Sequence, residues 1–412
     1  MHRMAVVIVL NGWLASIAAA DIVSFPMYAP STGGFPTVRA VSDDGSVLLG
    51  ISPSGVPSQV VGLRWSTTFA YATLNSGAIP SADATFADGL SADGSVVAGT
   101  DLTSRRAFRW TAAGAQLIDP RPAGTPGASS SASGVSADGS VMVGAMDGQP
   151  ARWTQAAGLQ QIGLPAGTTA GSASRVSADG TAVVGTAYAY GPSQLLKSAK
   201  AFRWTSGAMV ELTGPAGRAV NVAADVSADG HVAVGNSSVG FTPPDATLNE
   251  QWLDHPLAAR WLDGGAAQLL PLPGGADWAL ATATNADGTI VVGNAGVGGS
   301  DEFDHPSTLP WIWTSGSGTQ PLGGYLQSLG LNLSAWSTLG SIADISADGR
   351  TITGNGEMFI SPTQTAVVPW VVMIPSPMPP LLALPALGFV CRRRRSRVAD
   401  VHGSTSMASP NE

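Results

Sequence analysis

The chain has 412 residues, of which 44% are hydrophobic, 12% are charged and 51 are glycine. This composition suits many short strands joined by tight turns and disfavours intrinsic disorder, which requires few apolar residues. The net charge of −8, with only Lys197 and Lys200 as lysines, excludes a nucleic-acid-binding protein, because an acidic surface repels phosphate groups. The single cysteine, Cys391, excludes an internal disulfide framework.

Residues 1–20 have the pattern of a secretory signal peptide. A basic start at Arg3 precedes an apolar run over residues 5–17, and three alanines end the segment. This order of charge, apolar core and small cleavage-site residues is typical of exported chains. The alternative is a buried amino-terminal strand or helix. We expect export, with residues 21–374 as the folded domain.

One sequence unit recurs seven times in that domain. Each copy has an apolar-Ser-Ala-Asp-Gly stretch or a close variant, then a β-branched run ending in glycine, then a tryptophan that usually follows an arginine. The turn pairs are Asp44-Gly45, Asp93-Gly94, Asp138-Gly139, Asp179-Gly180, Asp229-Gly230, Asp287-Gly288 and Asp348-Gly349. The tryptophans are Trp65, Trp110, Trp153, Trp204, Trp261, Trp313 and Trp370. A fixed unit repeated along a chain indicates a repeat architecture.

The repeat predicts four strands per unit. Asp-Gly between two β-rich runs predicts a hairpin turn, because glycine tolerates a positive φ. In the third unit the strands are expected over residues 132–136, 140–144, 150–154 and 159–164. Four short strands every 41–61 residues are typical of propeller blades. We therefore predict an all-β, seven-bladed β-propeller of four-stranded blades.

The two ends of the domain predict how the ring closes. The last unit stops after its third strand, at residues 369–374. Residues 22–28 precede the first unit, in the place where other units have a fourth strand. We expect this amino-terminal strand to complete the last blade, since closure removes exposed sheet edges.

The units resemble the HAF repeats of bacterial extracellular proteins. Ala107-Phe108-Arg109-Trp110 and Ala201-Phe202-Arg203-Trp204 are similar to the Ala-Phe-aromatic core of that repeat, without its histidine. The resemblance covers about residues 37–374 and implies an extracellular repeat protein, with no common activity. The arginines before tryptophan (Arg64, Arg109, Arg152, Arg203 and Arg260) recur from unit to unit. We interpret them as structural groups that bind a turn aspartate or a strand carbonyl of an adjacent blade.

The connections between the second and third strands lengthen in units four to seven. They span residues 186–200, 236–258, 294–309 and 355–366. These units are consecutive, so the connections should cluster on one side of one face. Long insertions on one face of a repeat protein often mark its binding surface.

Within and beside these connections we identify six candidate ligand-binding residues. They are Trp252, Trp278, Asp254, His255, Asp304 and His305. Exposed tryptophans make stacking platforms for sugar rings. The two Asp-His-Pro pieces combine histidine with carboxylates, as divalent-cation sites do, but Asp-x-Pro also makes a rigid turn, which we favour. We predict no metal and no cofactor.

No catalytic motif is present, and we assign no catalytic residue. Charged residues nevertheless interrupt the small residues of the predicted axial strands, at Arg39, Asp88, Arg175, Asp225 and Asp344. We predict a non-catalytic propeller that binds extracellular polysaccharide or a surface protein. The alternative is a polysaccharide lyase or hydrolase with its site at the propeller axis.

Residues 375–412 resemble the PEP-CTERM sorting signal of bacteria. Pro375-Ser376-Pro377 is followed by an apolar run over residues 378–390 and by arginines 392–395. Serine stands where that signal usually has glutamate, and a polar end follows the arginines. The resemblance implies recognition by an exosortase, transient membrane contact through the tail, and a secreted or cell-surface location. The apolar run is too short for a dependable membrane span.

Overall fold

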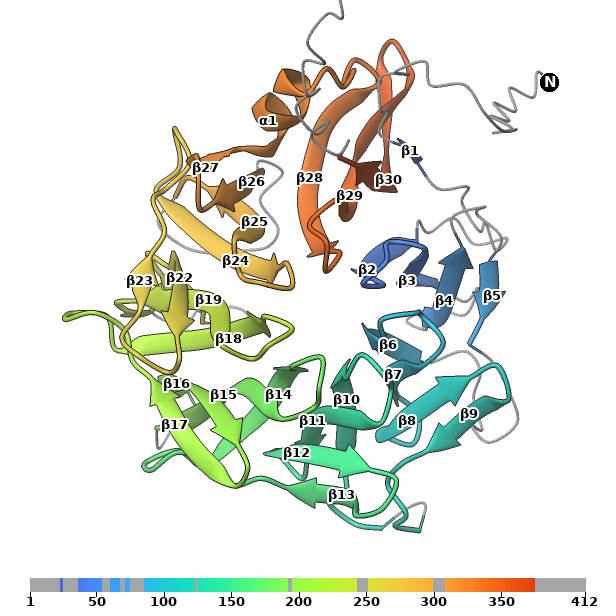
Figure 1. Cartoon of the computed structure of the whole chain (residues 1–412), viewed down its shortest axis with the longest axis vertical. Helices are drawn as coiled ribbons and strands as arrows, with labels where there is room; N and C mark the ends of the chain where they lie inside the picture. The colour runs from blue at the N-terminus through green and yellow to red at the C-terminus, as the bar shows by residue number, and fades with distance from the viewer. Residues whose placement is uncertain are drawn as a thin grey trace, which may run out of the picture. The chain divides into compact units, whose positions relative to one another are not determined.

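The computed structural model describes residues 23–24, 36–53, 60–66, 71–74, 85–122, 125–191, 195–242, 251–298 and 308–374. Seven four-stranded antiparallel sheets surround a central opening, so the predicted seven-bladed β-propeller is confirmed (Figure 1). The expected signal peptide and sorting tail lie outside the described residues. Within the described part, no helix is long and apolar enough to span a membrane.

The strands of each blade are called a to d in chain order, with strand a nearest the axis (Figure 1). The a strands are β2 (Thr37–Val41), β6 (Thr85–Leu90), β10 (Ser130–Val135), β14 (Ala170–Val176), β18 (Val220–Val226), β24 (Trp278–Thr284) and β28 (Trp336–Ile345). The b strands are β3 (Val47–Pro53), β7 (Val97–Asp101), β11 (Val141–Met146), β15 (Ala182–Tyr190), β19 (Val232–Ser238), β25 (Ile290–Gly296) and β29 (Thr351–Ser361). The c strands are β4 (Val60–Ser66), β8 (Arg106–Thr111), β12 (Gln149–Thr154), β16 (Leu196–Thr205), β22 (Leu257–Leu262), β26 (Leu309–Thr314) and β30 (Gln364–Met373). The d strands are β5 (Tyr71–Thr73), β9 (Gly114–Leu117), β13 (Gly158–Gln161), β17 (Ala208–Leu212), β23 (Gln268–Leu269), β27 (Gly318–Pro321) and, in blade 7, β1 (Val23–Ser24).

The ring closes as the sequence predicts. Strand β1 pairs antiparallel with β30, joining Val23 to Val371 and Ser24 to Trp370. Blade 7 therefore has the order β28-β29-β30-β1, with its outermost strand taken from the amino-terminal end. A short helix, α1 (Leu322–Ser328), precedes this blade and packs through buried Leu322 and Leu326.

The a–b turns are built by the repeated Ser-Ala-Asp-Gly stretch. In blade 3 the Ser136 hydroxyl donates to the Asp138 carboxylate at 2.7 Å, and the same carboxylate accepts the Ser140 N–H at 2.9 Å. Gly139 has a φ of +70°, which an L-residue rarely adopts. In blades 2 to 6 the alanine N–H of the turn donates to the alanine carbonyl of the next turn at 2.8–3.0 Å, which links Ala92, Ala137, Ala178, Ala228, Ala286 and Ala347 in order. The turns of blades 2 to 7 thus form one hydrogen-bonded chain.

The repeated arginines also join neighbouring blades. Arg64 donates to the carbonyl of Gly94 at 2.7 Å, and Arg203 donates to that of Gly230 at 2.8 Å. Arg152 makes the equivalent bond to the Gly180 carbonyl at 3.2 Å. In each case the acceptor lies in the a–b turn of the next blade. For these three residues the structural interpretation is confirmed.

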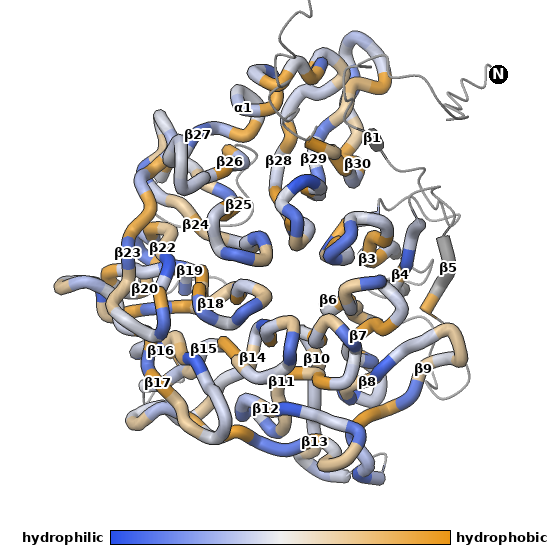
Figure 2. Tube along the Cα trace, in the orientation of Figure 1, coloured by the Kyte–Doolittle hydropathy of each residue, from blue (hydrophilic) through white to orange (hydrophobic). Residues whose placement is uncertain are grey.

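The core lies between consecutive blades rather than inside any one of them. The largest fully buried side chains include Trp65, Trp261, Trp311, Trp370, Phe108 and Phe202. One cluster combines Val184 and Ala201 of blade 4 with Trp261 of blade 5. Hydrophobic stretches follow the strands, whereas hydrophilic residues gather at the turns around the central opening (Figure 2). The glycine that ends each β-branched run makes room for these rings, since a side chain at Gly354 would overlap Trp370.

The residue after that glycine ties blades 5, 6 and 7 to their successors. Asn236, Asn294 and Asn355 each accept a backbone N–H from strand a of the next blade at 2.8–2.9 Å. For Asn355 the donor is Val38 of blade 1, and its amide also donates back to the Val38 carbonyl at 3.3 Å. This side chain therefore bridges the junction at which the ring closes.

Replacing Asn355 by alanine should lower the free energy of unfolding by about 1–3 kcal/mol, because the Val38 N–H is left without its acceptor. Urea denaturation of the purified protein measures this loss. Asn294→Ala is the matched comparison, because it removes the equivalent bond to the Ile342 N–H at a junction where the two blades are joined in sequence, and it should cause a similar loss. An unchanged urea midpoint for Asn355→Ala would show that the bridge contributes nothing.

Candidate functional site

A cavity of about 110 Å³ lies on the propeller axis, at the end of the blades that carries the a–b turns. All seven blades contribute to its wall, through the last residues of each strand a and the turn that follows. Most of these residues are alanine, glycine or valine. The polar and charged residues of the wall are Asp43, Asp88, Arg175, Asp225, Asp344, Thr284 and Asn285. Of the charged residues singled out in the sequence, Asp88, Arg175, Asp225 and Asp344 line the cavity. Arg39 does not line it and instead lies 3.5 Å from the Asp88 carboxylate.

A bulge in every strand a sets which residue faces the axis. The register of β14 against β15 shifts between Ala173 and Arg175, so Ser174 is the extra residue. The same one-residue shift occurs in the other six a strands. Blades approach closely here, since a Cβ at Gly134 would lie 3.0 Å from the Arg175 Cα. Small residues are thus required at most of the positions directly after the bulge. Arg175, Asp225 and Asp344 are the charged residues at this position.

Asp225 and Asp344 each connect two blades through both carboxylate oxygens. One oxygen accepts the N–H of the following residue at 2.8 Å. The other accepts an N–H from the next blade at 2.9 Å, from Thr284 for Asp225 and from Val41 for Asp344. The two carboxylates thus support the junctions of blades 5 with 6 and 7 with 1.

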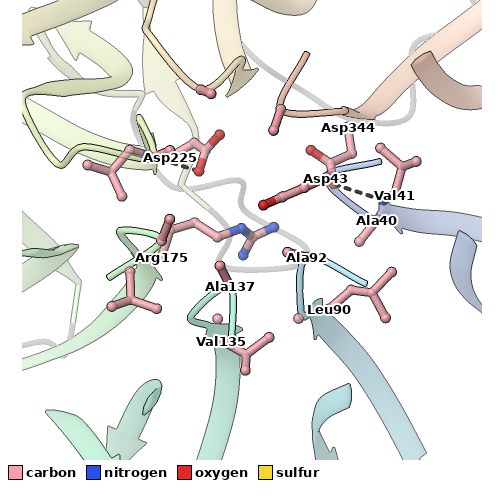
Figure 3. Close-up of a pocket in the computed structure, with 18 of the residues that line it drawn as sticks. Ala40, Val41, Asp43, Leu90, Ala92, Val135, Ala137, Arg175, Asp225 and Asp344 are labelled. Carbon is pink, nitrogen blue, oxygen red and sulfur yellow. Dashed lines mark hydrogen bonds between the residues drawn. The ribbon is translucent and has the colours of Figure 1, made fainter. Parts of the chain in front are cut away.

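Arg175 occupies the centre of the cavity (Figure 3). Its Nη1 donates to the carbonyls of Ser133 at 2.9 Å and Ser174 at 3.0 Å, which ties blade 4 to blade 3. Asp43 points toward the guanidinium from the opposite wall (Figure 3). Three carboxyl groups, those of Asp43, Asp225 and Asp344, therefore surround one guanidinium.

This crowding changes the acidity of the carboxyl groups. Burial raises the pKa of Asp344 to about 7; the charge of Asp225 adds to the rise, and Arg175 opposes it. Burial also raises the pKa of Asp225, against the opposing effects of Arg175 and the two N–H bonds. The pKa of Asp43 is raised by burial and by Asp225 and Asp44. Asp344 consequently exchanges its proton near neutral pH.

The cavity can hold water and a proton, but its size does not suit a polymer. Ligand sites usually occupy about 300–1,000 Å³. At about 110 Å³, the axial cavity has room for several water molecules. The carboxylates of Asp225 and Asp344, which a catalytic role would require, already accept backbone N–H groups. We therefore interpret these residues as supports of the ring.

The first Asp-His-Pro piece lies at a small hairpin above blade 5. Strands β20 (Gly240–Phe241) and β21 (Leu253–Asp254) form this hairpin, and Trp252 is half-buried beside it. His255 is exposed, has a φ of +49°, and lies 2.6 Å from the Asp254 carboxylate through its Nδ1. Its carbonyl accepts a 2.8 Å bond from Arg218. The segment is a turn held by backbone bonds.

The second piece, with Asp304 and His305, lies outside the described residues. Across the part of the chain that is described, no three His, Cys, Asp or Glu residues are grouped as a metal site requires. The interpretation of the second piece as a turn therefore stays a prediction.

Trp278 requires a correction. It is 2% exposed at the start of β24 and packs over Gly296 of the neighbouring strand. An indole covered on this scale has no free face on which a sugar could stack. Trp336, another non-repeat tryptophan, is also buried, with 8% of its surface exposed. Of the three, only Trp252 is partly accessible.

The described parts of the long b–c connections lie on the face opposite the axial cavity. In blades 4 and 7 much of the predicted connection is strand instead, since β15 reaches Tyr190 and β29 reaches Ser361. Tyr190 pairs with Leu196, whose N–H donates to the Gln251 side chain at 2.7 Å. Gln251 immediately precedes Trp252. The connections of blades 4 and 5 are therefore joined, with two aromatic residues at their junction.

Sequence reasoning missed that large apolar residues are exposed on all four of these connections. These residues are Tyr190, Val239, Val297, Phe359 and Ile360. Tyr190 is 43% exposed and Ile360 is 59% exposed. Exposed apolar residues gathered on one face often mark an interaction site. A large apolar residue at or just beyond the end of strand b in four consecutive units is the signal that could have found them.

Neither the protein-family models nor the sequences of curated proteins match this chain. Among solved structures, it is similar to TolB from Acinetobacter baumannii, with 16% identity and a TM-score of 0.39 over 68% of this chain and 61% of TolB. It is also similar to the β-propeller domain of the Trilobed protease from Pyrococcus furiosus, with 10% identity and a TM-score of 0.49 over 85% of this chain and 98% of that domain. A gluconolactonase from Xanthomonas campestris has 14% identity and a TM-score of 0.37, over 87% of this chain and 99% of that chain. The chain thus spans less than two thirds of TolB. These likenesses concern the propeller fold alone.

Proposed function

We propose that this protein is an exported, non-catalytic binding propeller that attaches to extracellular polysaccharide through the b–c face of blades 4 to 7. The observation that carries the proposal is that the bonds between Leu196 and Gln251 join the connections of blades 4 and 5, next to two aromatic residues: Tyr190 pairs with Leu196, and Trp252 follows Gln251. Tyrosine and tryptophan combine a flat apolar ring with a polar group, which suits the faces and hydroxyls of sugars. Export is supported by the sequence patterns of residues 1–20 and 375–412.

The double variant Tyr190→Ala, Trp252→Ala should lose most of the protein's retention on a polysaccharide, by about tenfold or more. Each aromatic side chain that stacks on a ligand contributes on the order of 1 kcal/mol, and the two contributions multiply in the binding constant. Affinity electrophoresis through gels containing neutral or acidic polysaccharides measures the retention.

Val210→Ala is the matched control, because Val210 is 46% exposed on strand d of blade 4, away from the b–c face. Retention unchanged in the double variant would contradict the proposed face. If no polymer retains the wild-type protein, the ligand is instead a surface protein, which a pull-down with the wild-type and double-variant chains detects.

A polysaccharide lyase or hydrolase is the second candidate, favoured by the near-neutral pKa of Asp344 in a cavity that Arg175 and three further carboxyl groups also line. Under the binding proposal, a polymer incubated with the protein keeps a constant number of reducing ends and unsaturated ends. Polymer shortening that Asp344→Asn abolishes would establish the enzyme instead.

A further inference from the structure

A second hollow lies between blades 2 and 3, on the face that bears the b–c connections. Its volume is about 370 Å³, which falls in the range of small-molecule sites. Its lining residues are Thr100, Leu102, Arg105, Ser129, Ser130, Ser131, Ala145, Asp147 and Gly148. Two hairpin turns make its walls, residues 102–105 from blade 2 and residues 147–148 from blade 3.

The hollow exists because the side chains at this junction are short. In blades 5 to 7 an asparagine follows the strand b glycine and bonds to the next blade. The equivalent residues of blades 2 and 3 are Thr100 and Ala145, and both line the hollow instead. The junction is therefore open at this end, although the blades remain packed below it.

The walls are held in place by their own hydrogen bonds. The Asp101 carboxylate accepts the N–H groups of Thr103 and Ser104 at 3.2 Å, which fixes the blade 2 turn. Arg105 and Asp147 both adopt the left-handed conformation, with φ values of 55° and 52°. A site formed in advance in this way loses little entropy when a ligand binds.

The acids next to the hollow have their own partners. Arg121 bonds to the carboxylates of Asp119 and Asp147, each at 2.6 Å. Burial would raise the pKa of Asp119, but the bonds from Arg121 hold it at about 2. Arg106 lies a further 3.7 Å from Asp119. With Asp101 of the blade 2 turn, three acids lie at this junction beside Arg106 and Arg121.

Arg105 differs from Arg106 and Arg121, which pair with these acids. Its side chain is exposed at the rim of the hollow, and none of the ion pairs between described residues includes it. A guanidinium binds a carboxylate or a sulfate through two parallel N–H bonds. The protein's distant negative charges weaken this attraction little, since salt screens them beyond about 8 Å.

We infer that this hollow binds one acidic sugar residue of a polysaccharide. The anionic group would pair with Arg105, the apolar face of the ring would lie against Leu102, which is 37% exposed, and Ser129 and Ser131 would offer hydroxyls. The inference rests on the proposed function for the choice of a saccharide, but it concerns a different part of the b–c face. A uronic acid and a sulfated sugar share the required chemistry.

The test is a calorimetric titration of the full chain with oligogalacturonate, a sulfated dextran oligomer and neutral dextran. We expect one or both anionic probes to bind and neutral dextran not to compete for this hollow. Arg105→Gln should weaken the binding by about tenfold, the contribution of a charge-assisted hydrogen bond. Ala145→Leu, which fills the hollow without changing the charge, should weaken it similarly. Arg350→Gln, at an exposed arginine in an a–b turn on the opposite face, should leave it unchanged.

The outcomes separate this inference from the proposed function. Anionic binding that survives Arg105→Gln and Ala145→Leu but is lost in Tyr190→Ala, Trp252→Ala would overturn the inference and support the proposed face. Absence of anionic binding, with neutral polymers still retained, would have the same consequence. Anionic binding that is lost in Arg105→Gln and kept in the double aromatic variant would support the inference even if the proposed face fails.

Discussion

Replacing Trp370 by alanine is expected to lower the free energy of unfolding by about 3–5 kcal/mol. Trp370 is fully buried in the blade that closes the ring, and its indole N–H donates to the Leu339 carbonyl at 2.9 Å. The substitution leaves a cavity over Gly354 and an unpaired carbonyl. The loss also affects the strand that β1 joins, so closure of the ring and packing of the core are weakened together.

Trp278 provides the matched comparison. It is 2% exposed, but no described residue accepts a hydrogen bond from its indole N–H. Trp278→Ala should therefore cost about 1–2 kcal/mol less than Trp370→Ala, because it also removes a buried, unpaired donor. Urea denaturation followed by circular dichroism measures both losses. A larger loss for Trp278→Ala would mean that the hydrogen bond of Trp370 contributes no stability.

The stability of the protein should fall between pH 5 and pH 8, and Asp344 should cause a large part of the fall. Its folded-state pKa is about 7, against 3.8 as the ordinary value. Between these values the folded protein holds a proton that the unfolded chain has released, so stability decreases as the pH rises. At about 1.4 kcal/mol per pH unit, Asp344→Asn should reduce the loss between pH 5 and pH 8 by about 2–3 kcal/mol.

Asp138 is the control, because its pKa is shifted in the opposite direction. A hydrogen bond from the Ser140 N–H, with further bonds from the hydroxyls of Ser136 and Ser140, lowers this pKa to about 2. The stability that it contributes is present above pH 4 and is lost as the pH falls toward 2. Asp138→Asn should therefore shift the whole curve between pH 5 and pH 8 without changing its slope. Parallel curves for the wild type and Asp344→Asn would contradict the assignment.

The sequence by itself determined the blade and the number of blades. The turn at Asp138-Gly139 depends on bonds within five residues and on a positive φ that glycine allows, so its pattern identifies it wherever it occurs. Seven such turns, with a missing last strand and a spare first one, were enough to predict seven blades and the closure by β1. The axial position of Arg175, Asp225 and Asp344 could be predicted for the same reason, since each follows a fixed place in the repeat.

Only the tertiary structure decided which residues of the candidate sites are accessible. Trp252 and Trp278 were equivalent in the sequence, yet one is half-buried and the other is covered by its own blade. Asp344 binds the Val41 N–H of the next blade, whereas Arg105 has no ion-pair partner among the described residues of either blade at its junction. Neither result could be read from the sequence, because each junction is formed by side chains distant in the chain. Burial and unpaired charge depend on these non-local contacts, whereas turns and strands depend on neighbours in sequence. That difference is the physical reason why the fold could be predicted and the binding surfaces could not.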